Sequence, residues 1–161
     1  MEMARQFNLQ IIIFTSLSLY SLAANKNLLT KISQASTILK IEMVFEPFGV
    51  EADNYPTIHS TLDFKANTGL CKVEYLSLTP KKSKRYSLTP KEMKTVQGLL
   101  KKMDLNMVQK KYSSDAPDEP TSYMTIYTSL GKFGISDHGL VGDSPLQEIY
   151  KIVYKLNQNI R

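Results

Sequence analysis

A capped helix at residues 88–103 is the feature that most constrains how this chain can fold. Thr89 supplies an N-cap oxygen, Pro90 occupies the first helical position, and Glu92 can reach back to the N–H of Thr89. After this start, apolar residues recur at helical spacing: Met93, Val96, Leu99, Leu100 and Met103. Gly98 interrupts the pattern, and we expect a neighbouring element to approach closely there. The stretch predicts an amphipathic helix that buries one face.

Alternation of apolar and polar residues predicts β-strands on both sides of this helix. The predicted strands cover residues 37–46, 57–64, 70–76, 85–88, 123–129 and 132–137. A turn is expected at residues 80–84, and the last two strands should form a hairpin around Leu130 and Gly131. In the first strand, one buried face is expected to contain Leu39, Ile41, Met43 and Phe45.

Two further helices are predicted after the capped helix. Asp104 should cap a short helix over residues 105–111, and residues 112–122 should form a polar loop. Ser144-Pro145-Leu146-Gln147 has the form of a second capping box and should open a C-terminal helix. The expected order is β-β-β-(β)-α-α-β-β-α. Because consecutive strands form hairpins, we predict an α+β fold with a mainly antiparallel sheet and helices packed on one face.

The N-terminus predicts export. Arg5 precedes an apolar run at residues 9–22, and Ser21 and Ala23 place small residues at the positions that a signal peptidase requires. We therefore expect a secretory signal peptide at residues 1–23, a flexible lead-in at 24–36, and a single α+β domain at 37–161. The protein would meet the membrane only through the signal peptide and would reside in the bacterial periplasm or outside the cell.

The second half of the chain resembles a family of small exported bacterial domains of unknown function. The resemblance rests on the capped helix at 88–103, Tyr112, Asp118-Glu119-Pro120, the hairpin that begins with residues 123–129, Asp137-His138-Gly139 and Pro145-Leu146. Family members often carry Cys-x-Gly-x-Cys-Pro, where this chain has Phe48-Gly49 and later Tyr55-Pro56. The resemblance implies an α+β fold and an exported location, and it implies no activity.

Two groups of residues could be imagined as catalytic. Cys71 could pair with His59 or His138, but Cys71 alternates with Val73 and Tyr75 on a face that we expect to be buried. Asp137, His138, Asp143 and Ser144 lie together in sequence, whereas the members of a catalytic triad usually converge from separate elements. A strand end, a turn and a helix cap account for this second group. We therefore expect no catalytic residue.

Metal and phosphate sites are also not expected. Asp115, Asp118 and Glu119 are acidic, but they lack the spaced ligands and final glutamate of a calcium loop. The chain has no Cys/His spacing typical of zinc and no glycine-rich phosphate loop. No cofactor is predicted.

The charge is unevenly distributed along the chain. Residues 72–111 hold eleven Lys or Arg against three acids, a net charge of +8, whereas residues 112–148 have a net charge of −5. The hypothesis that follows is a basic binding face, which can steer an anionic partner. Its members would be Lys81, Lys82, Lys84, Arg85, Lys91, Lys94, Lys101 and Lys102. An ordinary solvated helix face is the alternative interpretation of the same residues.

These patterns favour a non-enzymatic binding or inhibitor module. Its partner would be a protein or an anionic component of the cell envelope, since an exported protein seldom meets nucleic acid. Two alternatives stay open. The first is a periplasmic hydrolase centred on residues 137–144, and the second is a structural protein of the envelope.

Overall fold

The structure, a computed structural model, describes residues 37–48, 56–75, 82–105 and 108–159. The predicted signal peptide and lead-in lie outside these residues. The elements, in chain order, are β1 (Ile38–Glu46), β2 (Thr57–Asp63), β3 (Thr68–Tyr75), β4 (Lys82–Ser87), α2 (Pro90–Lys102), β5 (Lys111–Ser113), β6 (Thr121–Thr128), β7 (Gly131–His138), α3 (Ser144–Tyr154) and α4 (Leu156–Asn159). None of the described helices is long and apolar enough to cross a bilayer.

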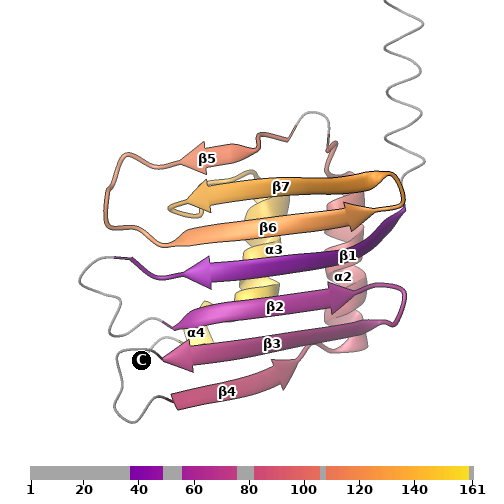
Figure 1. The fold of residues 1–161 in the computed structure, drawn as a ribbon, viewed down its shortest axis with the longest axis horizontal. Coiled ribbons are helices and arrows are strands. Elements are labelled where there is room, and N and C mark those ends of the chain that lie inside the picture. Colours follow the sequence, from indigo (N-terminus) through magenta and orange to yellow (C-terminus); the bar gives the residue numbers. More distant parts are fainter. Residues whose placement is uncertain (1–36, 49–55, 76–81, 106–107, 160–161) are drawn as a thin grey trace, which may run out of the picture. The chain divides into compact units, whose positions relative to one another are not determined.

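The strands form one seven-stranded sheet in the order β4-β3-β2-β1-β6-β7-β5. All neighbouring pairs are antiparallel except β5 and β7, which are parallel. Figure 1 shows α2 and α3 on the same side of this sheet, running across the strands. The predicted α+β class and the mainly antiparallel sheet are confirmed. We call the side that carries the helices the covered face, and the other side the open face.

The region after α2 corrects the predicted order of elements. The described residues of the predicted helix at 105–111 are not helical, and the N–H of Val108 donates to the carbonyl of Asp104 at 2.9 Å. Residues 106 and 107 lie outside the described part. The chain then forms β5, whose Tyr112 is buried and pairs with Asp137 of β7. A strand of three residues is too short to show an alternating pattern, so the sequence predicts a loop there instead of a strand.

The start of α2 is confirmed in detail. The N–H of Glu92 donates to the Thr89 hydroxyl at 3.2 Å, and the Glu92 carboxylate accepts from the N–H of Thr89 at 2.7 Å. Met93, Val96, Leu99 and Leu100 are buried. The expected close approach occurs at Gly69 of β3, where an added Cβ would lie 2.7 Å from the Met93 sulfur, and not at Gly98, where it would meet nothing within 4 Å.

β1 departs from simple alternation at its first residues. Its pairing with β6 shifts between Ile38 and Lys40, so the strand contains a bulge. As a result Ile38 is buried while Leu39 is 41% exposed, which contradicts the predicted position of Leu39. An extra residue in one strand reverses which side chains face the core. After the bulge, Ile41, Met43 and Phe45 are buried as predicted.

Two other predicted boundaries are wrong. Lys82 and Lys84, predicted in a turn, belong to β4. The N-cap of α3 is Asp143, without a side-chain cap hydrogen bond, so the capping box predicted at Ser144 does not form. The Gln147 side chain instead donates to the carbonyl of Gly142 at 2.9 Å. Asp143 and Ser144 are both polar residues that can precede a helix with Pro145 in its first turn, so the sequence alone does not distinguish the two N-caps. In the structure the N-cap is Asp143.

The core lies between the covered face and the two longer helices. The C-terminal end of α3 is held there by the sheet: the hydroxyl of Tyr86 and the thiol of Cys71 both donate to the carbonyl of Val153. The fully buried Tyr154 packs against Phe45, with ring centroids 5.3 Å apart. These contacts hold α3 against the covered face, and none of the described helices lies on the open face.

Candidate binding surface

The open face is built by strand alternation. Each strand turns every second side chain away from the helices, so the residues between the buried positions of β1, β2 and β3 are polar or only partly buried. Two exposed large apolar side chains accompany them, Leu70 on β3 at 55% and Tyr123 on β6 at 45%. The open face is therefore a mixed surface of charged, hydroxyl, aliphatic and aromatic groups.

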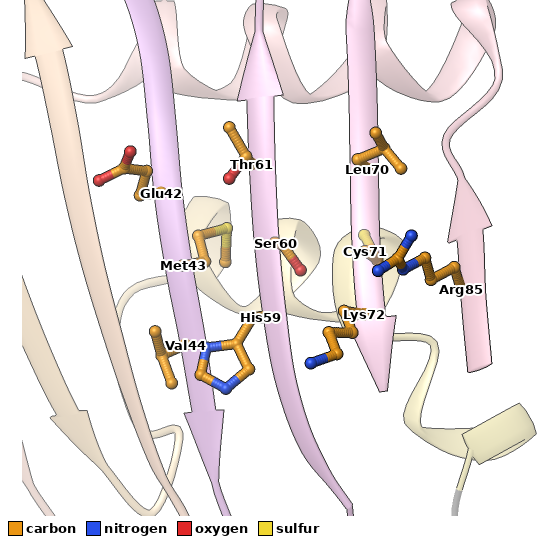
Figure 2. Close-up of a pocket in the computed structure, with 10 residues that line it drawn as sticks. All are labelled: Glu42, Met43, Val44, His59, Ser60, Thr61, Leu70, Cys71, Lys72 and Arg85. Atoms are coloured by element: carbon orange, nitrogen blue, oxygen red, sulfur yellow. The ribbon is translucent and has the colours of Figure 1, made fainter. Parts of the chain in front are cut away.

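A hollow of about 450 Å³ lies on this face over β1 to β4. Figure 2 shows the residues that line it: Glu42, Met43, Val44, His59, Ser60, Thr61, Leu70, Cys71, Lys72 and Arg85. Met43, Ser60 and Cys71 are buried on the covered face, so their backbone forms the floor. The remaining side chains form the walls, and the Arg85 guanidinium reaches from β4 across to β3 (Figure 2).

Three of these side chains form a basic row. His59 of β2 pairs with Lys72 of β3, and Lys72 pairs with Arg85 of β4. Paired residues on adjacent strands stand about 5 Å apart, so the three groups follow one another across the sheet. The same register continues from His59 to Val44 and then to Tyr123. The basic row thus leads into an aliphatic and aromatic stretch at the centre of the open face.

The acids near the hollow are already paired. Glu74 accepts from Lys72 at 2.7 Å and lies 3.5 Å from Nε2 of His59. Glu42 accepts from Lys40 at 2.7 Å and from the Tyr127 hydroxyl at 2.6 Å. The hydrogen bond from Lys40, followed by that from Tyr127, holds the pKa of Glu42 below its usual value. Among described residues, Arg85 makes no ion pair, so it gives the hollow its uncompensated positive charge.

The structure distributes the predicted basic face over three surfaces. Arg85 lines the hollow, whereas Lys82 and Lys84 alternate with it and pair with the buried Tyr75 and Val73 on the covered side of edge strand β4. The exposed lysines of α2 lie opposite its buried residues, away from the sheet, and they are Lys91, Lys94, Lys101 and Lys102. Lys81 lies outside the described part.

The basic row also contains two residues that were not assigned to a site from the sequence. The side chain of His59 is 49% exposed, and its alignment with Lys72 and Arg85 was not predicted. In the hairpin of β2 and β3 as the structure shows it, His59 precedes the end of β2 by as many residues as Lys72 follows the start of β3, so the two face each other. The strand bounds predicted from the sequence, 57–64 and 70–76, do not give this register.

The Cys71 pairs considered from the sequence do not form. Cys71 is 1% exposed on the covered face, and burial raises the pKa of its thiol. His59 is on the open face, opposite Lys72, so the sheet separates its ring from the thiol. His138 uses both ring nitrogens elsewhere, Nδ1 with the Thr121 hydroxyl at 3.1 Å and Nε2 with the carbonyl of Ala116 at 2.9 Å.

Residues 137–144 make structural hydrogen bonds that hold the loop between β7 and α3. The fully buried Asp137 carboxylate accepts from the N–H groups of Val141 and Gly142, at 2.9 and 3.0 Å. The Asp143 carboxylate accepts from the Tyr112 hydroxyl at 2.9 Å. These bonds close the loop between β7 and α3 and dock β5 against it.

The acidic loop gives no cluster of ligands. Glu119 accepts a hydrogen bond from the Ser114 hydroxyl, and Asp115 and Asp118 are exposed. Within the described ranges, no group of three or more His, Cys, Asp or Glu side chains is arranged to hold a metal ion.

Comparisons with protein-family models, with curated proteins and with solved structures find no match to this chain. The resemblance to the exported bacterial domains therefore stays a prediction, and the interpretation of the open face rests on its own geometry.

Proposed function

We propose that this chain is a non-enzymatic binding module, exported by a bacterium, that docks an acidic segment of another protein on the open face of its sheet. The observation that carries the proposal is the open face, on which no described helix lies, with a hollow in which Arg85 has no acidic partner among described residues. A carboxylate of the bound protein would supply the acid that Arg85 lacks. Complementary charges speed encounter and select among partners.

The composition of the open face favours a protein over a lipid surface or a bare anionic polymer. Tyr123 and Val44 continue the line of the basic row, and exposed Leu70 lies beside it. Tyrosine and arginine are enriched at the centres of protein interfaces, where an aromatic or aliphatic anchor accompanies a desolvated charge. A partner that presents carboxylates next to apolar side chains would satisfy both parts of this surface.

The test compares two pairs of charge reversals that change the net charge equally. The double variant Lys72→Glu, Arg85→Glu alters the hollow, and the matched control Lys94→Glu, Lys101→Glu alters the outer side of α2. The probe is a rhodamine-labelled peptide of alternating aspartate and serine, because alternation in an extended peptide places all carboxylates on one side. Fluorescence anisotropy at about 0.15 M salt reports its affinity, since long-range charge effects are then largely screened.

We expect the hollow variant to bind at least about tenfold more weakly and the control to change by less than about twofold. Equal weakening in both would mean that the peptide senses only net charge, and the proposed surface would be wrong. Weakening in the control alone would assign binding to the helix lysines. Vesicles with anionic lipid that bind the protein when the peptide does not would identify a membrane ligand instead and contradict the proposal. Thermal unfolding of each variant checks that it is folded.

A further inference from the structure

The basic row contains one histidine, His59, and histidine is the side-chain type that most readily gains or loses a proton near neutral pH. Its ring is half exposed on the open face, and Nε2 lies 3.5 Å from Oε2 of Glu74. The other oxygen of the same carboxylate accepts from Lys72 at 2.7 Å. The Glu74 carboxylate therefore contacts both His59 and Lys72. When His59 is protonated, the single negative charge of Glu74 balances only one of these two positive charges.

The charged groups around His59 define what protonation would do. On β3 it faces Lys72 and Glu74, and beyond them Arg85 of β4. On β1 the nearest acid that lines the hollow, Glu42, is engaged by Lys40 and Tyr127. Glu46 is exposed at the end of β1, and Asp63 of β2 accepts from N–H groups of the turn that follows it.

The net charge of the basic row together with Glu74 therefore depends on pH. With His59 neutral, Lys72 and Arg85 outnumber Glu74 by one charge, and protonation of His59 makes the excess two. A protonated imidazole also donates from both ring nitrogens, so Nε2 can hold Glu74 while Nδ1 is available to a ligand.

We infer that His59, Lys72 and Arg85 form a pH-gated subsite for a carboxylate of the partner, and that binding of this carboxylate is coupled to uptake of one proton by His59. The inference rests on the proposed function and adds its regulation. The proton comes from solvent and goes to the imidazole, and no covalent bond changes. Because the protonated state is the one that favours an anion, binding tightens as pH falls and weakens as pH rises.

The experiment measures the affinity of the aspartate–serine peptide between about pH 7.5 and 5.5, a window in which histidine titrates and the carboxylates of the peptide stay ionised. We expect the affinity to rise by about threefold or more for each unit that the pH falls over part of this window. Coupling to a single proton limits this rise to about tenfold per pH unit. His59→Gln should remove the pH dependence. His138→Gln, which alters the other histidine of the chain, should retain it.

Calorimetry in two buffers with different ionisation enthalpies counts the protons taken up directly. Uptake of between about one half and one proton at the steepest point, lost in His59→Gln, supports the inference. Affinity that is independent of pH in the native protein, or a slope that persists in His59→Gln, overturns the inference and leaves the binding surface standing. A peptide that binds at neither end of the window overturns both the inference and the proposed function.

Discussion

The two faces of the sheet use the same strands for different purposes. On β2, Ile58 is fully buried against the helices, while the next residue, His59, lies on the open face with half of its side chain exposed. On β3 the same contrast separates Cys71 from Lys72. Because side chains alternate along a strand, a single residue step moves a position from the core to the surface. The covered face therefore contains the packing that stabilises the fold, and the open face is the surface on which we propose that a partner binds.

The polar contacts of the two faces differ in the same way. On the covered face, the hydroxyls of Ser122 and Tyr154 lie 2.6 Å apart where neither is exposed. On the open face, the Tyr127 hydroxyl donates to Glu42 at the same distance, but next to solvent. Loss of a partner leaves a buried group unsatisfied, whereas water replaces the partner of an exposed one. The comparison predicts large stability effects on one face and small ones on the other.

The largest expected effect comes from adjacent residues of β2. Ile58→Ala should lower the free energy of unfolding by about 2–5 kcal/mol, because it leaves a cavity in a packed core. His59→Ala should change it by less than about 0.5 kcal/mol, since the side chain is half exposed. Denaturant unfolding of the two variants measures both values. A similar cost at the two positions would contradict the division of roles between the faces.

A second test concerns the place where α2 meets the covered face. Gly69→Ala should lower the free energy of unfolding by about 1–3 kcal/mol, because the new Cβ would lie 2.7 Å from the Met93 sulfur and 3.0 Å from Cβ of Leu88. Gly98→Ala makes the same chemical change where nothing lies within 4 Å. It should raise the stability by about 0.5–1 kcal/mol through helix propensity. Thermal unfolding of both variants should show shifts of opposite sign.

Two stacked tyrosines of α3 provide a third test. The hydroxyls of Tyr154 and Ser122 are hydrogen-bonded to each other. Tyr154→Phe should therefore lower the free energy of unfolding by about 1–2 kcal/mol, because it leaves the Ser122 hydroxyl buried without this partner. The buried Tyr150 hydroxyl finds no hydrogen-bond partner among described residues. Tyr150→Phe should therefore be neutral or stabilising. A cost at Tyr150 that equals the cost at Tyr154 would show that its hydroxyl has a partner, such as a buried water.

The smallest effect concerns the link between the two helices. Glu92 accepts from Lys155 at 2.7 Å as well as from Thr89. Partial burial opposes its ionisation, but the bonds from Lys155 and Thr89 outweigh burial and hold the pKa of Glu92 below its usual 4.5. The resulting stability is present above that pH and is lost as pH falls through the lower, folded pKa. Glu92→Gln should lower the free energy of unfolding by about 0.5–1 kcal/mol at neutral pH.

The pH dependence and a second variant sharpen this test. The difference between native protein and Glu92→Gln should begin to shrink below about pH 4.5, where the Glu92 carboxylate of the unfolded chain becomes protonated, and should disappear below the lower pKa that Glu92 has in the folded protein. Lys155→Gln should show a similar loss at neutral pH, and the double variant should lose less than the two single losses added together. Additive losses would mean that the ion pair between α2 and α3 contributes no stability.

Local patterns predicted the elements whose cause is local. The box formed by Thr89 and Glu92 marks the start of α2, and alternation identifies the buried residues of β2 and β3. The bulge beside Leu39 and the parallel strand β5 escaped prediction because they depend on pairing with β6 and β7, distant in sequence. Such contacts are decided by packing between elements, which periodicity within one element does not report.

The candidate site was predicted only in part for a related reason. The positive charge of residues 72–111 was correctly recognised, and Arg85 was assigned to the basic face. Because side chains alternate along β4, Lys84 and Arg85 lie on opposite faces of the sheet. The lysines of α2 lie on the side of the helix that points away from the sheet. Charge counted along a sequence cannot show which residues share a surface. The alignment of His59 with Lys72 and Arg85 is a property of the order β2-β3-β4 in the sheet.

The most direct test of the open face as the binding surface is a titration of isotopically labelled protein with the aspartate–serine peptide, followed by amide NMR. We predict that the largest shifts map to β1 to β4 around His59, Lys72 and Arg85 and extend to Tyr123, while the exposed side of α2 changes little. Shifts concentrated at Lys91, Lys94, Lys101 and Lys102 with an unchanged open face would contradict the central claim.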